Sequence, residues 1–170
     1  MRTLRLVATL YFVTDRERFL LQRIQPALIG LIDGSLSTLA PIFSVAIVSH
    51  KPHYAFVAGL ATSIGAGISM AFSEGLSDTG ELTGRGNALT RGTITGVGTL
   101  LGGILHTLPF LIPHYQAALI TAACVVALEL VALAWIRWRF FETSFVKSLG
   151  YVSLAGLVIA IVGAAIGAGV

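Results

Sequence analysis

The sequence has few charged side chains, and this scarcity is its first informative property. Only 11% of its 170 residues are Asp, Glu, Lys or Arg, whereas soluble domains carry about 25%. Hydrophobic residues make up 55% of the chain, and the mean hydropathy is +0.87. This composition excludes an ordinary soluble domain and indicates a membrane protein.

Cysteine is almost absent. The one cysteine, Cys124, excludes an intrachain disulfide and a cysteine-rich metal site. It falls in an apolar run, where we expect it to pack in the core. The sequence also lacks a nucleotide-binding motif, a nucleophile–base pair and a metal-hydrolase motif. We therefore predict that the protein is not an enzyme and holds no permanently bound cofactor.

Five long apolar runs dominate the chain, at residues 27–49, 55–72, 92–112, 117–136 and 149–170. Because a helix needs about 20 apolar residues to cross a bilayer, we predict an all-α membrane protein with five transmembrane helices. These form one domain, residues 26–170. Residues 1–25 are predicted to be a cytoplasmic or interfacial segment, because DRERF follows the apolar start where a signal peptide would have a small-x-small cleavage site.

The basic residues are distributed unevenly between the predicted loops. If the N-terminus is cytoplasmic, ten of the eleven basic residues lie inside: Arg2, Arg5, Arg16, Arg18, Arg23, Arg85, Arg91, Arg137, Arg139 and Lys147. Only Lys51 then lies outside. The positive-inside rule thus predicts a cytoplasmic N-terminus and an external C-terminus. It also explains the net charge of +3, so nucleic acid is not an expected partner.

Small residues repeat every four positions in several runs. The repeats are Gly59–Ser63–Gly67, Gly92–Gly96, Gly98–Gly102 and Gly163–Gly167. This spacing lets helix backbones approach closely. It predicts a tight bundle and is compatible with a homodimer.

Three carboxylates lie in or at the end of apolar runs: Asp33, Glu129 and Glu74. Even lenient scales assign about 2.5–3.5 kcal/mol to a charge at the centre of a membrane helix, so such residues indicate function. Each has an alternative. Asp33 could bond a neighbouring Ser or Thr, and Glu74 could be a solvated helix end. Glu129 is either a proton relay or hydrogen-bonded to a small polar group on another helix.

Helical spacing places further donors beside these carboxylates. Ser37 follows Asp33 by one turn, and Pro41 lacks the N–H that would bind the Ser37 carbonyl, so we expect a kink there. Met70 precedes Glu74 by one turn. We predict that Asp33, Met70 and Glu74 bind a metal ion. Ser37 is a candidate for lining its path, and the alternative for Met70 is core packing.

Two carboxylates and a thioether suit a divalent transition metal, whereas carboxylate and water alone would suit Mg²⁺ or Ca²⁺. Asp78 and Glu81, in the loop after the second run, are candidates for the place where ions arrive from the cytoplasm. His106 and His114 are expected near the outer face. They could assist release, or they could be solvated loop histidines.

Two stretches resemble a known family. Residues 33–46 (DGSLSTLAPIFSVA) and 58–77 (AGLATSIGAGISMAFSEGLS) are similar to the first two helices of the vacuolar iron transporter family, which pairs Asp-Gly with S-M-A-x-x-E. The closer resemblance is to the membrane half of bacterial membrane-bound ferritin proteins. It is carried by residues 19–43, residues 65–86 and LELVALAWIR (128–137), and GGILHTLPFLIP (102–113) fits as well.

This resemblance implies a homodimeric transporter of divalent iron, with helices one and two lining the path at the dimer interface. Asp33 and Met70 match the path residues of the family, and Glu74 matches the Glu beyond them. The chain differs from these families in two respects, and both remove residues that would capture iron before transport. Only a short loop separates spans two and three, where eukaryotic members insert a metal-binding domain. Residues 1–25 cannot encode the ferritin-like domain of the bacterial relatives.

We therefore expect Fe²⁺ or Mn²⁺ to be exported across a bacterial inner membrane in exchange for protons. Asp33 is expected to face its counterpart across the dimer axis, and Asp33 and Glu74 are candidate exchange sites. The competing interpretation is a non-transporting dimeric membrane anchor or scaffold. It fits the small-residue spacing equally well, but it does not account for Asp33, Met70 and Glu74.

Overall fold

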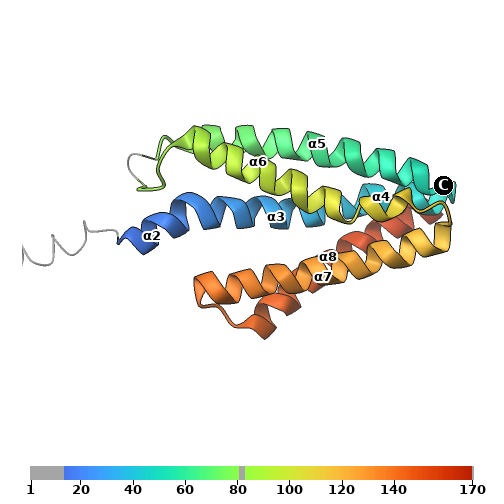
Figure 1. The fold of residues 1–170 in the computed structure, drawn as a ribbon. Coiled ribbons are helices and arrows are strands. Elements are labelled where there is room, and N and C mark those ends of the chain that lie inside the picture. Colours follow the sequence, from blue (N-terminus) through green and yellow to red (C-terminus); the bar gives the residue numbers. More distant parts are fainter. Residues whose placement is uncertain (1–13, 81–82, 170) are drawn as a thin grey trace, which may run out of the picture.

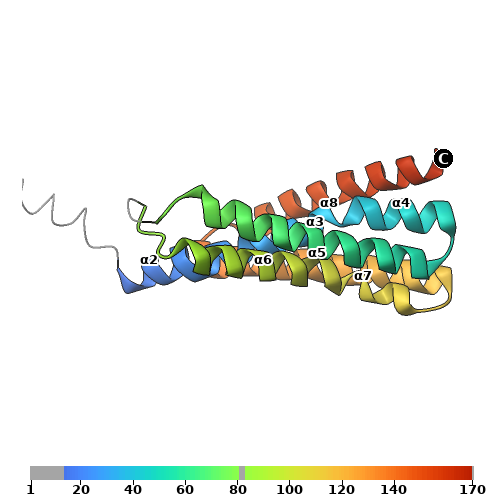
Figure 2. The same ribbon diagram turned by 90° about the horizontal axis from the view of Figure 1, so that it is seen from above.

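The computed structural model describes residues 14–80 and 83–169, and all regular elements in these ranges are helical. The elements are α2 (Asp15–Phe19), η1 (Leu20–Ile24), α3 (Gln25–Ser37), α4 (Leu39–Ser49), α5 (Pro52–Ser77), α6 (Ala88–Leu105), η2 (Leu108–Leu111), α7 (Tyr115–Phe141) and α8 (Phe145–Ala168). Figure 1 shows α3 between the pair α5–α6 and the pair α7–α8. The view from above shows that the helices run roughly along one direction (Figure 2).

Four helical segments are long and apolar enough to cross a membrane: Asp15–Ser49, Pro52–Ser77, Tyr115–Phe141 and Phe145–Ala168. They make a multi-pass membrane protein plausible. The first already begins at Asp15, so residues 15–25 extend the first predicted span as helix. Residues 1–13 lie outside the described part. The third predicted span forms α6, but α6 is rich in glycine and threonine and does not belong to the strongly apolar group.

Two prolines set where helices end in the middle of the bundle. A proline has no N–H for the carbonyl four residues before it, and its ring clashes with that carbonyl. Accordingly α3 ends at Ser37, four residues before Pro41, and α6 ends at Leu105, four residues before Pro109. The break predicted one turn above Asp33 is confirmed. The predicted extension of the third helix to residue 112 is wrong, because Pro109 stops it.

Glycines let α6 pack directly on the backbones of two neighbours. A Cβ at Gly96 would collide with Gly67 and Ala71 of α5, and one at Gly102 would collide with the Leu31 carbonyl of α3. Gly92 and Gly98 repeat these contacts one turn earlier. The glycine repeats of α6 therefore serve packing within one chain.

The last helix uses the same device. A Cβ at Gly163 or Gly167 would meet the backbone of Ala40 or Ser44, so α8 lies directly against α4. The prediction of a tight bundle is confirmed. Cys124 is exposed on α7, so the expectation that it packs in the core is wrong.

Candidate functional site

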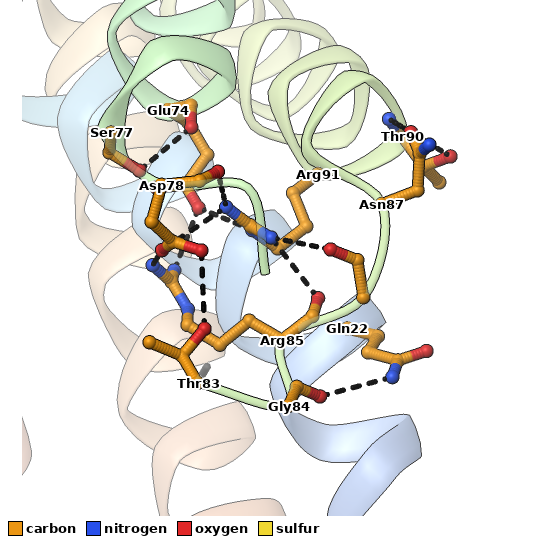
Figure 3. A network of polar contacts seen from close by, with 11 residues as sticks. Gln22, Glu74, Ser77, Asp78, Thr83, Gly84, Arg85, Asn87, Thr90 and Arg91 are labelled. Carbon is orange, nitrogen blue, oxygen red and sulfur yellow. Dashed lines mark hydrogen bonds and ion pairs between the residues drawn. The ribbon is translucent and has the colours of Figure 1, made fainter. Parts of the chain in front are cut away.

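Four charged side chains form one network where α5 and α6 meet their connecting loop (Figure 3). Glu74 lies near the end of α5, Asp78 and Arg85 lie in the loop, and Arg91 lies in the first turn of α6. Oε1 of Glu74 accepts hydrogen bonds from Nη2 of Arg85 at 2.7 Å and from Nε of Arg91 at 2.8 Å. Oδ2 of Asp78 lies 3.1 Å from Nη1 of Arg85 and 3.3 Å from Nη2 of Arg91. Two carboxylates and two guanidinium groups thus neutralise one another.

Arg91 is the most deeply buried member of this network, with 1% of its side chain exposed. Its Nη1 donates to the Gly86 carbonyl at 2.8 Å, and its Nη2 donates to the Asp78 carbonyl at 3.1 Å. Gly80 has a φ of 83°, and a Cβ there would collide with the Gly86 carbonyl and crowd Arg91. Glycine is therefore required for the loop to close around the guanidinium.

Asp78 lies just beyond α5, outside the membrane-crossing segments. Partial burial of its carboxyl group acts to raise the pKa, while hydrogen bonds from Thr83 and from the backbone of Gly80 act in the opposite direction. The charge of Arg91 and the hydrogen bond from Arg85 add to the lowering. The pKa of Asp78 consequently lies below its ordinary value of 3.8.

The network changes the interpretation of two predicted site residues, Glu74 and Asp78. Glu74 is only 10% exposed and is paired with arginines, so it is not a solvated helix end. A cation at Oε1 of Glu74 or at Oδ2 of Asp78 would have to compete with the guanidinium groups that already bind these oxygens. Glu81 lies outside the described residues. The sequence analysis used Arg85 and Arg91 only to predict which side of the membrane their loop faces. The glycine-rich loop was the signal that these arginines could fold back against α5.

Asp33 is placed differently from Glu74. It lies on α3, one turn before the break after Ser37, and its side chain is partly exposed, while Ser37 is exposed. Within residues 14–80 and 83–169, the ion pairs involve other side chains and no Ser or Thr bonds the Asp33 carboxylate. The alternative for Asp33, a structural hydrogen bond to a neighbouring Ser or Thr, is therefore not found in these ranges.

Met70 lies on α5 and is partly buried. The small residues before it on the same stripe are buried: Gly59 approaches Ile42 of α4, and Gly67 approaches Gly96 of α6. In the described chain, no group of three or more His, Cys, Asp or Glu side chains is arranged to hold a metal ion. The described residues of one copy therefore do not assemble such a site around Asp33 and Glu74.

A second polar cluster lies in the middle of the bundle. Nδ1 of His106 is 3.0 Å from Oε2 of Glu129, and Nε2 of His106 is 2.7 Å from Oγ1 of Thr38. The Thr38 hydroxyl also donates to the Gly34 carbonyl at 2.9 Å. The exposed fractions are 0% for Thr38, 1% for His106 and 8% for Glu129. This chain of contacts joins the α3–α4 break to the end of α6 and to the middle of α7.

The cluster bears on two earlier alternatives. Glu129 contacts the His106 imidazole and not a small polar group, and its role as a proton relay stays a prediction. The expectation that His106 is a solvated loop histidine is wrong, because α6 ends at Leu105 and leaves His106 inside the bundle. His114 is exposed. The early stop imposed by Pro109 was the sequence signal that could have placed His106 in the interior.

Comparisons with known proteins found no relative: no family model, no curated protein and no solved structure matches the chain. The case for a function therefore depends on the motifs, the fold and the two polar clusters.

Proposed function

We propose that the protein is a membrane transporter of divalent transition metal ions, Fe²⁺ or Mn²⁺, as its resemblance to the vacuolar iron transporter family implies. The observation that carries the proposal is Asp33. It is a carboxylate within the segment Asp15–Ser49, which is apolar enough to cross the membrane. It lies beside a helix break and has no ion-pair partner in the described chain. A carboxylate in that environment is expensive unless it binds something.

A second copy of the chain would complete the site. Two-fold symmetry presents the same patch twice, so Asp33 and Met70 of two copies would supply two carboxylates and two thioethers. Sulfur donors favour softer ions over Mg²⁺ and Ca²⁺. The partial exposure of Asp33 and the exposure of Ser37 support a shared path between copies. The glycine repeats lend no support to the dimer, since they pack within the chain.

The distribution of basic residues and the charge of the metal ion indicate the direction of transport and its energy source. We propose five crossings with a cytoplasmic N-terminus and an external C-terminus, in a bacterial inner membrane. The close packing of α6 between α3 and α5 supports the fifth crossing. Export of a divalent cation against an inside-negative potential costs about 4.6 kcal/mol per 100 mV. The chain has no nucleotide-binding motif, so inward-moving protons are the proposed source.

Metal movement in sealed vesicles tests the proposal. Purified protein is reconstituted, and Fe²⁺ or Mn²⁺ movement is followed with and without a pH gradient. Asp33→Asn removes the costly charge at nearly constant volume, so we expect a folded protein that moves no metal. Asp15→Asn, at the exposed start of α2, is the matched control and should transport like the wild type.

The alternative of a membrane anchor predicts a different result. A wild-type protein that moves neither ion, or an Asp33→Asn variant that transports normally, would refute the proposed role of Asp33. The anchor interpretation also gives no reason for an unpaired carboxylate on α3.

A further inference from the structure

The protons of the Thr38–His106–Glu129 cluster can be counted from its hydrogen bonds. A threonine hydroxyl has one hydrogen, and at Thr38 it points to the Gly34 carbonyl at 2.9 Å. With the hydroxyl hydrogen placed there, the Thr38 oxygen accepts from Nε2 of His106 at 2.7 Å, and the ring is the tautomer with its hydrogen on Nε2.

The other ring nitrogen faces a carboxylate oxygen. Nδ1 of His106 and Oε2 of Glu129 are 3.0 Å apart, and two bare lone pairs at that distance would repel. One proton must lie between them. Whether it is bonded to nitrogen, giving imidazolium and carboxylate, or to oxygen, giving imidazole and carboxylic acid, the pair has the same number of protons and no net charge.

We propose that Thr38, His106 and Glu129 form the proton-binding site of the transporter, separate from the metal site at Asp33. This inference rests on the proposed function. Glu74, the other candidate for proton exchange, already accepts hydrogen bonds from Arg85 and Arg91. The His106–Glu129 pair is buried in the middle of the bundle, where a bound proton cancels a charge that the interior would not tolerate.

The helices around the pair carry other titratable groups. On α3, Asp33 lies on the turn before Thr38, and on α5 the charged Glu74 lies near the inner end. Among the described residues, the ion pair of His106 is with Glu129 alone. Oε1 of Glu129 is buried and has no partner in the described chain. The only described contact through which this carboxyl group shares a proton is therefore the one between Oε2 and His106.

Release of the proton requires the contact to open. When Nδ1 and Oε2 separate, one proton leaves to water, His106 remains neutral with its hydrogen on Nε2, and Glu129 remains as a carboxylate. The reverse step takes up one proton and restores the neutral pair. Since the contact joins α6 to α7 and, through Thr38, to the α3–α4 break, proton exchange is linked to movement of these helices.

The first test does not depend on transport. Nitrogen NMR of histidine-labelled protein in lipid nanodiscs reports which ring nitrogens carry hydrogen. Substituting the exposed His50, His53 and His114 by Gln leaves the His106 signals. A hydrogen on Nε2, with Nδ1 either protonated or hydrogen-bonded to Glu129, supports the proton count. A ring with hydrogen on Nδ1 and a bare Nε2 would overturn it, because Thr38 would then be the donor.

The second test measures coupling in vesicles that contain a pH-sensitive dye. Glu129→Gln keeps the shape of the side chain and can donate an amide N–H to Nδ1, but it cannot exchange a proton. We expect downhill Mn²⁺ movement to persist and metal-dependent proton movement to be lost. Glu142→Gln, at the exposed end of α7, should retain both.

The outcomes separate the two proposals. Proton movement that survives in Glu129→Gln would overturn the proton site while leaving metal transport intact. A wild type that moves no metal would refute the proposed function, and the NMR measurement would still decide the proton count. If Glu129→Gln does not fold, the NMR result on the protein with native Glu129 carries the test.

Discussion

Oγ1 of Thr38 lies 2.7 Å from Nε2 of His106, and this contact joins two helix breaks of the same origin. Each of the two residues is the first after a helix that stops four residues before a proline, Pro41 in one case and Pro109 in the other. The two breaks therefore meet inside the bundle. Their polar groups bond to each other where both side chains are almost completely buried.

Removing the Thr38 hydroxyl should destabilise the protein. Thr38→Val keeps the shape but leaves Nε2 of His106 without its hydrogen-bond partner, and a buried unsatisfied polar group costs about 1–3 kcal/mol. Thr93→Val, at an exposed position of α6, should change stability by no more than about 0.5 kcal/mol. Unfolding in mixed micelles measures both free energies. Equal effects would show that the Thr38 contact contributes nothing.

The buried guanidinium of Arg91 should be more important to stability than any exposed arginine. Arg91→Met leaves Glu74 with Arg85 alone and breaks a buried ion pair, for which losses of about 3–5 kcal/mol are typical. Arg16 pairs with Glu142 at 3.2 Å, but these side chains are 64% and 77% exposed. Arg16→Met should therefore cost less than about 1 kcal/mol. The same unfolding assay compares the two, and similar losses would contradict the buried network.

Backbone contact between α3 and α6 predicts a strong effect of a single methyl group. A Cβ at Gly34 would collide with the Thr99 carbonyl and the Gly103 nitrogen. Backbone atoms cannot move aside, so Gly34→Ala should destabilise by about 1–3 kcal/mol. Gly65 lies in α5 with nothing within 4 Å of an added Cβ. There Gly65→Ala should be neutral or stabilising by about 0.5–1 kcal/mol.

Much of the fold could be predicted from the sequence, because apolar length and small-residue spacing are local properties. The helix end at Ser37 could also be predicted locally, from Pro41 four residues later. The partners of Glu74 and Glu129 could not be predicted, since they depend on how distant segments come together. Arg91 looked like a topological charge and His106 like a loop residue until the packing of α6 placed both in the interior.

Acidification should reduce the stability that the loop between α5 and α6 contributes to the fold. The pKa of Asp78 is lower in the folded protein than its ordinary value of 3.8, so its carboxylate stabilises the fold above that pH. The contribution is lost as pH falls through the folded-state pKa. Stability measured from neutral pH down to acid should fall more steeply in the wild type than in Asp78→Asn. Identical slopes would show that Asp78 gains nothing from Arg85 and Arg91.

The thioether of Met70 tests the selectivity proposed for the metal path. Met70→Leu conserves volume and removes the sulfur, so folding should be retained while Fe²⁺ movement in vesicles decreases. The unfolding assay serves as the control for packing. Unchanged Fe²⁺ movement would assign Met70 to packing alone.

Helix α6 is joined to its neighbours by polar side chains near both of its ends and by backbone contacts between them. Arg91, in its first turn, pairs with Glu74 of α5, and His106, the residue after its end, contacts Glu129 of α7. The two positions are about 22 Å apart along the helix at 1.5 Å per residue. Between these points, glycines such as Gly98 and Gly102 set the α6 backbone against that of α3. The two ends of α6 thus depend on different chemistry, arginine–carboxylate pairing at Arg91 and a histidine–carboxylate contact at His106.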